Sequence, residues 1–137
     1  MTMTYQQQYL LNGLAGRAAI LDLSARHNRL YSAGDLGGWI ATFRHSGATF
    51  VRAGETFTDL RAAFDGGSGK RLCTLDHEIG VDGVDATQRC VALLWSRTDL
   101  CATGTFLDQL TYERGGWYFT SRELKWDPVP RKDAVSV

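Results

Sequence analysis

The fold is decided by the stretch from Arg71 to Trp126, which reads RLCTLDHEIGVDGVDATQRCVALLWSRTDLCATGTFLDQLTYERGGWYFTSRELKW. Along most of this stretch apolar and polar residues alternate, which is the period of a strand with one covered face. Asp82-Gly83 and Gly115-Gly116 are typical turn formers. The pattern predicts four long strands over residues 71–81, 86–97, 102–112 and 117–126, joined as an antiparallel meander.

The residues before this meander follow a helical period instead. A helix is predicted over residues 13–32, with Asn12 as its cap. Its apolar stripe is formed by Leu14, Ala18, Leu21, Ala25 and Leu30 and is widened by Ile20 and Leu23. Two short helices are predicted over residues 36–43 and 60–64, on either side of a strand at 49–52.

Helices followed by a strand meander indicate an α+β fold. A long antiparallel sheet needs one face covered, and the N-terminal helices are the elements available to cover it. A wide, twisted sheet curls, so we expect a cone-shaped α+β barrel in which a curved antiparallel sheet wraps around the helices. The mouth of such a cone is a natural pocket for a small molecule. We expect one domain over residues 1–137, with an ordered core over about 10–127 and a tail after 128.

Composition narrows the possible functions. Fifteen basic and fifteen acidic residues give no net charge, which argues against nucleic acid as a partner. The three cysteines are widely spaced and no metal-ligand or nucleotide motif is present, so we expect no metal, no cofactor and a reducing, cytoplasmic compartment. The polar N-terminus lacks the pattern of a signal peptide, and no apolar run reaches membrane-spanning length.

Several strings give the chain a resemblance to a known superfamily. They are Arg17-Ala18-Ala19-Ile20-Leu21-Asp22-Leu23, the spacing Asp35…Trp39…Phe43, Gly104-Thr105-Phe106-Leu107-Asp108, and Gly116-Trp117-Tyr118-Phe119-Thr120-Ser121-Arg122. Together with the element order, they resemble the SnoaL-like branch of the nuclear transport factor 2-like superfamily. The resemblance covers nearly the whole chain and implies the cone fold. The superfamily contains dehydratases, a dehydrochlorinase, isomerases, cyclases, oxygenase β-subunits and non-catalytic binders, so the likeness implies no single activity.

The chain departs from the nearest enzymes of that branch at their catalytic pair. The scytalone dehydratase and hexachlorocyclohexane dehydrochlorinase types move a proton with an Asp–His pair. The resemblance places these two positions at Ser32 and Leu72, which have no comparable acid–base chemistry.

Other residues could supply proton transfer. His27 and Tyr31 are four apart and share a helix face, which the resemblance turns into the pocket. An imidazole beside a phenol can act as base and acid, although a buried histidine satisfied by the protein is the alternative. Arg52 could hold a developing anion, or it could face solvent.

Further pocket residues are expected on the strands. Asp76 and His77 are neighbours, so only one can face inward, and the resemblance favours Asp76, with an exposed aspartate near a strand end as the alternative. The other predicted substrate-binding residues are Trp39, Phe50, Leu72, Thr74, Phe106 and, near the rim, Asp108. Plain core packing is the alternative for Trp39 and Phe106, and it is the favoured one for Trp39. Small residues at Ala92 and Gly104 are expected to leave room for a flat ring.

The leading hypothesis is a cofactor-independent lyase or isomerase acting on a small aromatic or polycyclic compound. In it His27 and Tyr31 transfer protons, Arg52 stabilises negative charge and Asp76 orients or shares a proton. The alternatives are a non-catalytic binding or structural module and, ranked last, a subunit of an oxygenase. An apolar outer sheet face, expected from Val91, Leu93, Trp95, Leu107 and Leu124, predicts a homodimer or higher homo-oligomer.

Overall fold

The computed structural model describes residues 2–129 and has the predicted α+β order. Most of the predicted tail, residues 130–137, lies outside the described residues. The elements are α1 (Tyr5–Ala33), α2 (Leu36–Ile40), β1 (Thr49–Arg52), β2 (Glu55–Phe57), α3 (Leu60–Ala63), β3 (Lys70–Asp82), β4 (Asp85–Ser96), β5 (Asp99–Glu113) and β6 (Gly116–Trp126). The four long strands agree with the sequence pattern to within a few residues.

One six-stranded sheet holds all the strands in the order β2-β1-β6-β5-β4-β3. Strands β3 to β6 form the predicted antiparallel meander. The sheet as a whole is mixed, because β1 pairs with β6 in parallel. The crossover from β1 to β6 joins residues far apart in the sequence, and local periodicity carries no information about such a pairing. Strand β2 was also missed, since three residues are too few to show a period.

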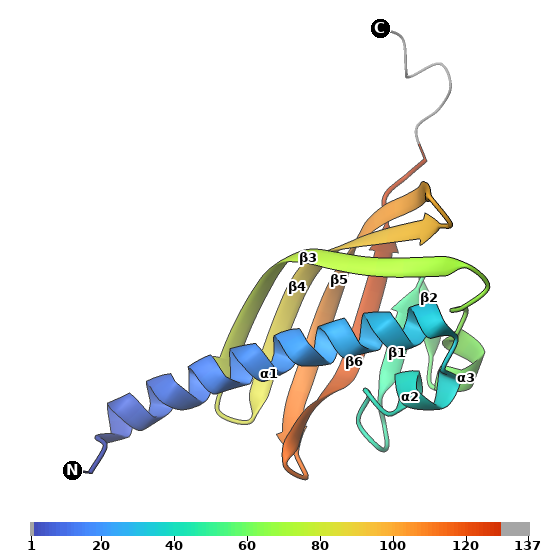
Figure 1. Ribbon diagram of the computed structural model, residues 1–137. Coiled ribbons are helices and arrows are strands. Elements are labelled where there is room, and N and C mark those ends of the chain that lie inside the picture. The colour runs from blue at the N-terminus through green and yellow to red at the C-terminus, as the bar shows by residue number, and fades with distance from the viewer. Residues whose placement is uncertain (1, 130–137) are drawn as a thin grey trace, which may run out of the picture.

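The sheet curves around the helices (Figure 1). Register shifts interrupt the ladders between Leu75 and Glu78, between Leu94 and Trp95, and between Gln109 and Leu110. Each bulge bends its strand and increases the local twist. The long helix α1 crosses the concave side, with α2 and α3 near its C-terminal end (Figure 1). The resulting shape is the expected cone.

Helix α1 begins earlier than the predicted residue 13. A capping box starts it, in which the Thr4 hydroxyl accepts from the Gln7 backbone N–H and the Gln7 side chain accepts from the Thr4 N–H. The intervening glutamines carry no apolar period, so the sequence pattern did not reveal these first turns. Gly34, at φ 73°, ends the helix in the left-handed conformation that favours glycine.

The face of α1 that docks on the sheet is only one edge of the predicted apolar stripe, the edge that contains Ile20 and Leu23. Buried residues on α1 include Ile20, Leu23, Ser24, His27 and Tyr31. Most of the predicted stripe is exposed, namely Leu14, Ala18, Leu21 and Ala25. The helix has apolar residues on two sides, and periodicity detects the spacing of a stripe without showing which side the sheet covers.

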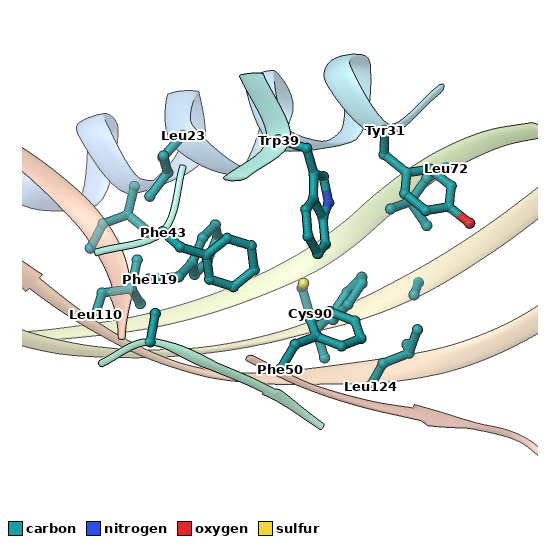
Figure 2. Packing of buried hydrophobic residues seen from close by; sticks show 14 of the residues in the cluster. Leu23, Tyr31, Trp39, Phe43, Phe50, Leu72, Cys90, Leu110, Phe119 and Leu124 are labelled. Atoms are coloured by element: carbon teal, nitrogen blue, oxygen red, sulfur yellow. The ribbon is translucent and has the colours of Figure 1, made fainter. Parts of the chain in front are cut away.

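The core lies between α1 and the concave face of the sheet (Figure 2). Trp39 and Phe43 of the α2 region pack with ring centroids 4.9 Å apart, and Phe43 lies 5.7 Å from Phe119 of β6. Phe50 of β1 completes this aromatic cluster at 5.7 Å from Trp39. Leu124 also lies in this core, so its predicted place on the outer sheet face was wrong. The bulge between Gln109 and Leu110 lies along this strand pair and changes which residues face inward.

Gly104 does not leave room for a ligand, contrary to expectation. A Cβ there would lie 2.5 Å from the Lys125 carbonyl oxygen and 2.8 Å from Trp126 Cε3. The glycine therefore allows β6 and its tryptophan to approach β5 closely. By contrast, a Cβ at Gly80 of β3 would make only an ordinary contact, 3.5 Å from the Thr87 hydroxyl oxygen.

We expect Gly104→Ala to lower the free energy of unfolding by about 1–3 kcal/mol, because the strands must move apart to admit the methyl group. The matched variant Gly80→Ala should change stability by less than about 1 kcal/mol. Urea denaturation followed by tryptophan fluorescence measures both. Equal stability of the two variants would contradict the close approach of β6 at Gly104.

Candidate functional site

A small cavity of about 40 Å³ lies between the C-terminal half of α1 and the concave sheet face. A volume of this size has room for only a few water molecules. Seven of the predicted pocket residues line it: His27, Tyr31, Trp39, Phe50, Arg52, Leu72 and Phe106. The others are Ala63, Asp65, Leu94, Leu124 and Trp126. The predicted convergence of α1 and β1 on one enclosed space is therefore present, although aromatic side chains fill most of the cone.

Three polar side chains meet at the rim of this cavity. The Tyr31 hydroxyl donates to Asp65 Oδ1 at 3.0 Å, and Arg52 Nη1 lies 3.6 Å from Asp65 Oδ2. Arg52 also donates to the Ala63 carbonyl at 2.8 Å, which holds its guanidinium beside Asp65. Burial is the main cause that raises the pKa of Tyr31, with the Asp65 charge second, so the phenol stays protonated and able to donate.

Asp65 has no feature in the sequence that selects it as a site residue. It follows α3 in a glycine-rich loop, where no period predicts the direction of a side chain. The loop packs directly on the end of α1, since the Gly67 N–H donates to the Tyr31 carbonyl at 2.8 Å and a Cβ at Gly66 would collide with that same carbonyl. Two glycines thus bring the carboxylate beside the phenol.

His27 lies at the back of the cavity with both ring nitrogens bound by protein. Trp39 Nε1 can only donate, so at 2.9 Å it donates to Nε2 of His27. The proton of the neutral ring then sits on Nδ1 and is donated to the Thr42 hydroxyl at 2.9 Å. Burial first, and the charge of Arg122 second, hold the pKa of His27 well below its ordinary 6.5. His27 is thus neutral, and the Trp39 N–H occupies its free lone pair. This is the alternative given above, a buried histidine satisfied by the protein.

The two positions of the family's acid–base pair do come together. The Ser32 hydroxyl accepts a hydrogen bond from the Leu72 backbone N–H at 3.0 Å, and it donates to the Asn28 carbonyl at 2.8 Å. These contacts tie the end of α1 to β3. They contain no group that titrates near neutral pH.

The expectation that Asp76 faces inward was wrong. Asp76 is exposed, at φ 54°, in the bulge between Leu75 and Glu78. The extra residue reverses the alternation of the strand, so the neighbouring His77 turns inward and its Nδ1 donates to Gln88 Oε1 at 2.7 Å. Thr74, before the bulge, keeps its predicted direction and accepts from Asn28 Nδ2 at 2.7 Å.

Asp108 is not near the rim, contrary to expectation, but deep inside the cone. Its side chain is fully buried and accepts from Arg122 Nε at 2.9 Å. Gln88 donates to its second oxygen at 2.8 Å and also contacts Ser24 of α1. Burial raises the pKa of Asp108, while Arg122 and Gln88 act in the opposite direction.

Arg122, which the sequence did not single out as a site residue, is fully buried. Its guanidinium carbon lies 3.6 Å from the centre of the Phe106 ring and 4.5 Å from that of Phe119. Its Nη2 lies 3.9 Å from Cys90 Sγ, and Nη1 has no hydrogen-bond partner among the described residues. The flat cation is therefore held by one carboxylate and by aromatic faces.

Within residues 2–129 no three His, Cys, Asp or Glu side chains gather closely enough to hold a metal ion. No helix there is long and apolar enough to cross a membrane.

Solved structures with the same architecture define the fold as nuclear transport factor 2-like, also described as cystatin-like. A Mycobacterium tuberculosis protein of unknown function, Rv3472 with an Asp-to-Asn change, aligns with a TM-score of 0.78 at 23% identity, over 100% of this chain and 84% of its own. A scytalone dehydratase candidate from Novosphingobium aromaticivorans aligns with a TM-score of 0.74 at 19% identity, over 84% of this chain and 86% of its own. LinA aligns with a TM-score of 0.67 at 18% identity, over 84% and 88%.

The sequence itself matches the family model of the SnoaL-like domain over residues 13–123. The chain belongs to the SnoaL-like domain family. Members of this fold family include dehydratases and dehydrochlorinases. No curated protein matches the sequence. The structural identities quoted above show a shared fold and do not transfer an activity.

The buried, neutral His27 should make stability depend on pH. The unfolded chain binds a proton at this residue below about pH 6.5, whereas the folded chain does not until much lower pH. Stability is therefore fully present above pH 6.5 and falls below it, by up to about 1.4 kcal/mol per pH unit. We expect His27→Gln to flatten this slope between about pH 6.5 and 5.

The control for this prediction is His45→Gln, which changes an exposed histidine in a loop. It should leave the slope unchanged. Urea denaturation at a series of pH values gives the slopes, and a His27→Gln slope equal to that of the wild type would contradict the neutral state.

We expect Asp108→Ala to lower the free energy of unfolding by about 3–5 kcal/mol, because it leaves the Arg122 charge buried without a partner. The double variant Asp108→Leu/Arg122→Met removes both charges and should recover much of that loss. Denaturation of the two variants measures the difference. A double variant less stable than Asp108→Ala would show that the pair itself, rather than the orphaned charge, carries the stability.

Proposed function

We propose that the cone binds a small, largely apolar compound with an oxygen substituent, such as a hydroxylated aromatic ring, and acts on it as a cofactor-independent lyase or isomerase. One observation carries this proposal: Tyr31, Asp65 and Arg52 converge at the rim of a cavity whose walls are otherwise mostly apolar. A pocket with a few convergent polar groups on apolar walls is typical of a small-molecule site.

The rim can supply a complete proton-transfer cycle. Asp65 has a half-exposed side chain and can accept a proton from a substrate carbon. The Tyr31 hydroxyl can donate a proton to the leaving group, which departs with the bonding electron pair. The protonated Asp65 then returns a proton to the phenolate across their 3.0 Å hydrogen bond. The substrate loses a proton and a leaving group, and the protein is unchanged.

Arg52 is placed to stabilise negative charge that develops during this step. Its side chain is mostly buried, and the guanidinium carbon lies 5.7 Å from the centre of the Phe50 ring and 5.3 Å from that of Phe57. A low-dielectric setting strengthens its interaction with an enolate or phenolate oxygen. Aromatic walls at Trp39 and Phe106 could stack on a flat substrate.

This assignment changes two roles from the sequence-based hypothesis. Asp65 takes the place of the exposed Asp76 as the carboxylate of the site. His27 could act as a proton acceptor only if the Trp39 N–H withdrew from its Nε2, so its proposed role is to hold Trp39 in the cavity wall. Tyr31 and Arg52 keep the roles given to them from the sequence.

The small size of the cavity requires adjustment when a ring enters. Asp65 and Arg52 are lining residues that reach solvent, with side-chain exposures of 48% and 22%, and their charges lie 3.6 Å apart. The Asp65 side is open enough to water for a substrate oxygen to replace its carboxylate beside Arg52. Side-chain rearrangement of this extent is common on binding.

A non-catalytic binding module is the second candidate function. The contact between Ser32 and Leu72, which occupies the place of the family's acid–base pair, favours it. This candidate shares the cavity and its ligand class with the first, and it differs in that no bond of the ligand changes.

The test begins with a panel of small hydroxylated aromatic compounds, screened by thermal shift and then by mass spectrometry for conversion. Arg52→Gln should weaken binding of a hit by about tenfold, because it removes one charged hydrogen bond. Arg71→Gln, which removes an exposed arginine of β3, is the control and should bind like the wild type.

Tyr31→Phe separates the two candidates. In a lyase it should retain binding within a few-fold and lose most turnover, since the general acid is gone. In a binding module no compound is converted by any variant. If Arg52→Gln binds the compound as tightly as the wild type, the ligand does not contact the rim of the cavity, and both candidate functions are contradicted.

A further inference from the structure

The solvent side of α1 carries a continuous apolar seam with heptad spacing. The seam consists of Leu11, Leu14, Ala18, Leu21 and Ala25, whose separations alternate between three and four residues. All five are exposed, with Leu14 at 60%. Three-four alternation is the spacing that keeps one helix face in contact with another helix.

The seam and the sheet-packing face lie on opposite sides of α1. With Leu11 and Ala18 as a positions and Leu14 and Leu21 as d positions, Gly16 and Leu23 fall at f, which is the position farthest from the seam. Both of these f residues are buried, and a Cβ at Gly16 would contact Val81 of β3 at 3.3 Å. The helix therefore has one apolar side for the sheet and another for a different partner.

No described element covers this seam. Within residues 2–129, α1 packs against β3, β6 and α2, and these contacts lie on its inner side. The N-terminal turns of α1 extend past the edge of the sheet into the surroundings (Figure 1). Isolated exposed leucines are common on proteins, but a helix face with this length of ordered apolar spacing is unusual.

The partner is indicated by the charges beside the seam. Arg17 precedes the a position Ala18 and occupies g, while Asp22 follows the d position Leu21 and occupies e. In two parallel helices, a g residue faces the e residue of the next heptad on the partner, which matches Arg17 with Asp22 of a second copy. Both are exposed, and the Arg17 side chain donates to the Ile79 carbonyl through Nε, at 3.2 Å.

We propose that α1 pairs in parallel with α1 of a second copy of this chain, through Leu11, Leu14, Ala18, Leu21 and Ala25. A two-fold axis along the helices would set the two sheets away from the pair, because Ile20, Leu23 and His27 face the sheet on a different side of α1 from the seam. Two Arg17–Asp22 contacts flank the seam, and residues 2–16 carry no charge that would repel a copy. This interface is separate from the cavity and from the outer face of the sheet.

The first test measures assembly directly. Leu14→Glu/Leu21→Glu places charges in the seam and should halve the mass measured by light scattering at a concentration where the wild type is paired. Val84→Glu, a change at an exposed residue of the β3–β4 turn, is the matched control and should keep the wild-type mass. Circular dichroism confirms that each variant is folded, as expected for exposed positions. A monomeric wild type, or an unchanged mass in the seam variant, overturns the proposal.

The second test fixes the partner and the orientation. Arg17→Glu should raise the dissociation constant by about tenfold, because it sets a second carboxylate against Asp22 of the other copy, and Arg17→Glu/Asp22→Arg should restore it. Leu14→Cys, made with Cys73 and Cys101 changed to Ser, should form a disulfide-linked dimer under mild oxidation, whereas Asn12→Cys in the same background should not. Absence of both the charge rescue and the Leu14→Cys disulfide overturns the parallel pairing.

Discussion

The buried ion pair between Asp108 and Arg122 is the constraint on which the interior of this protein depends. The two residues are register partners on β5 and β6, and both are withdrawn from solvent. Burying a charge pair is costly, and further hydrogen bonds to the pair offset part of that cost. Gln88 on β4 donates to Asp108 and also contacts Ser24 on α1, whereas Arg122 Nη1 has no hydrogen-bond partner among the described residues. The polar network therefore joins three strands and the long helix in one arrangement.

This network explains why the docked face of α1 is partly polar. The inner side of the helix presents Ser24, His27 and Asn28 among its apolar residues, and each binds a group on the sheet or on the α2 region. The heptad seam of the same helix faces solvent. A helix with two apolar sides has two ways to lie on a sheet, and the interior hydrogen bonds favour only one of them.

The candidate site follows from the same layering. The charged pair lies at the floor of the cone, the aromatic cluster of Trp39, Phe43 and Phe119 fills its middle, and Tyr31, Asp65 and Arg52 stand at the rim. His27 connects the layers, because its ring packs against the aromatic cluster while its pKa is lowered by burial and by the nearby Arg122. Inside the cone His27 is neutral and Asp108 is paired with Arg122. At the rim, the Asp65 carboxylate is half-exposed.

The sequence by itself determined the α+β class, the four long strands and most of the cavity lining, because these depend on local period and on short strings read along the chain. Tyr31, Arg52, Trp39 and Phe50, which the resemblance assigns to a pocket, do line the small cavity. Only the tertiary structure decided the parallel pairing of β1 with β6, the inward turn of His77 and the position of Asp65 beside Tyr31. A bulge reverses every side chain beyond it, a loop carboxylate has no period, and a helix with two apolar stripes does not show which one is covered. Those choices are made by contacts between residues far apart in the sequence, which no local pattern records.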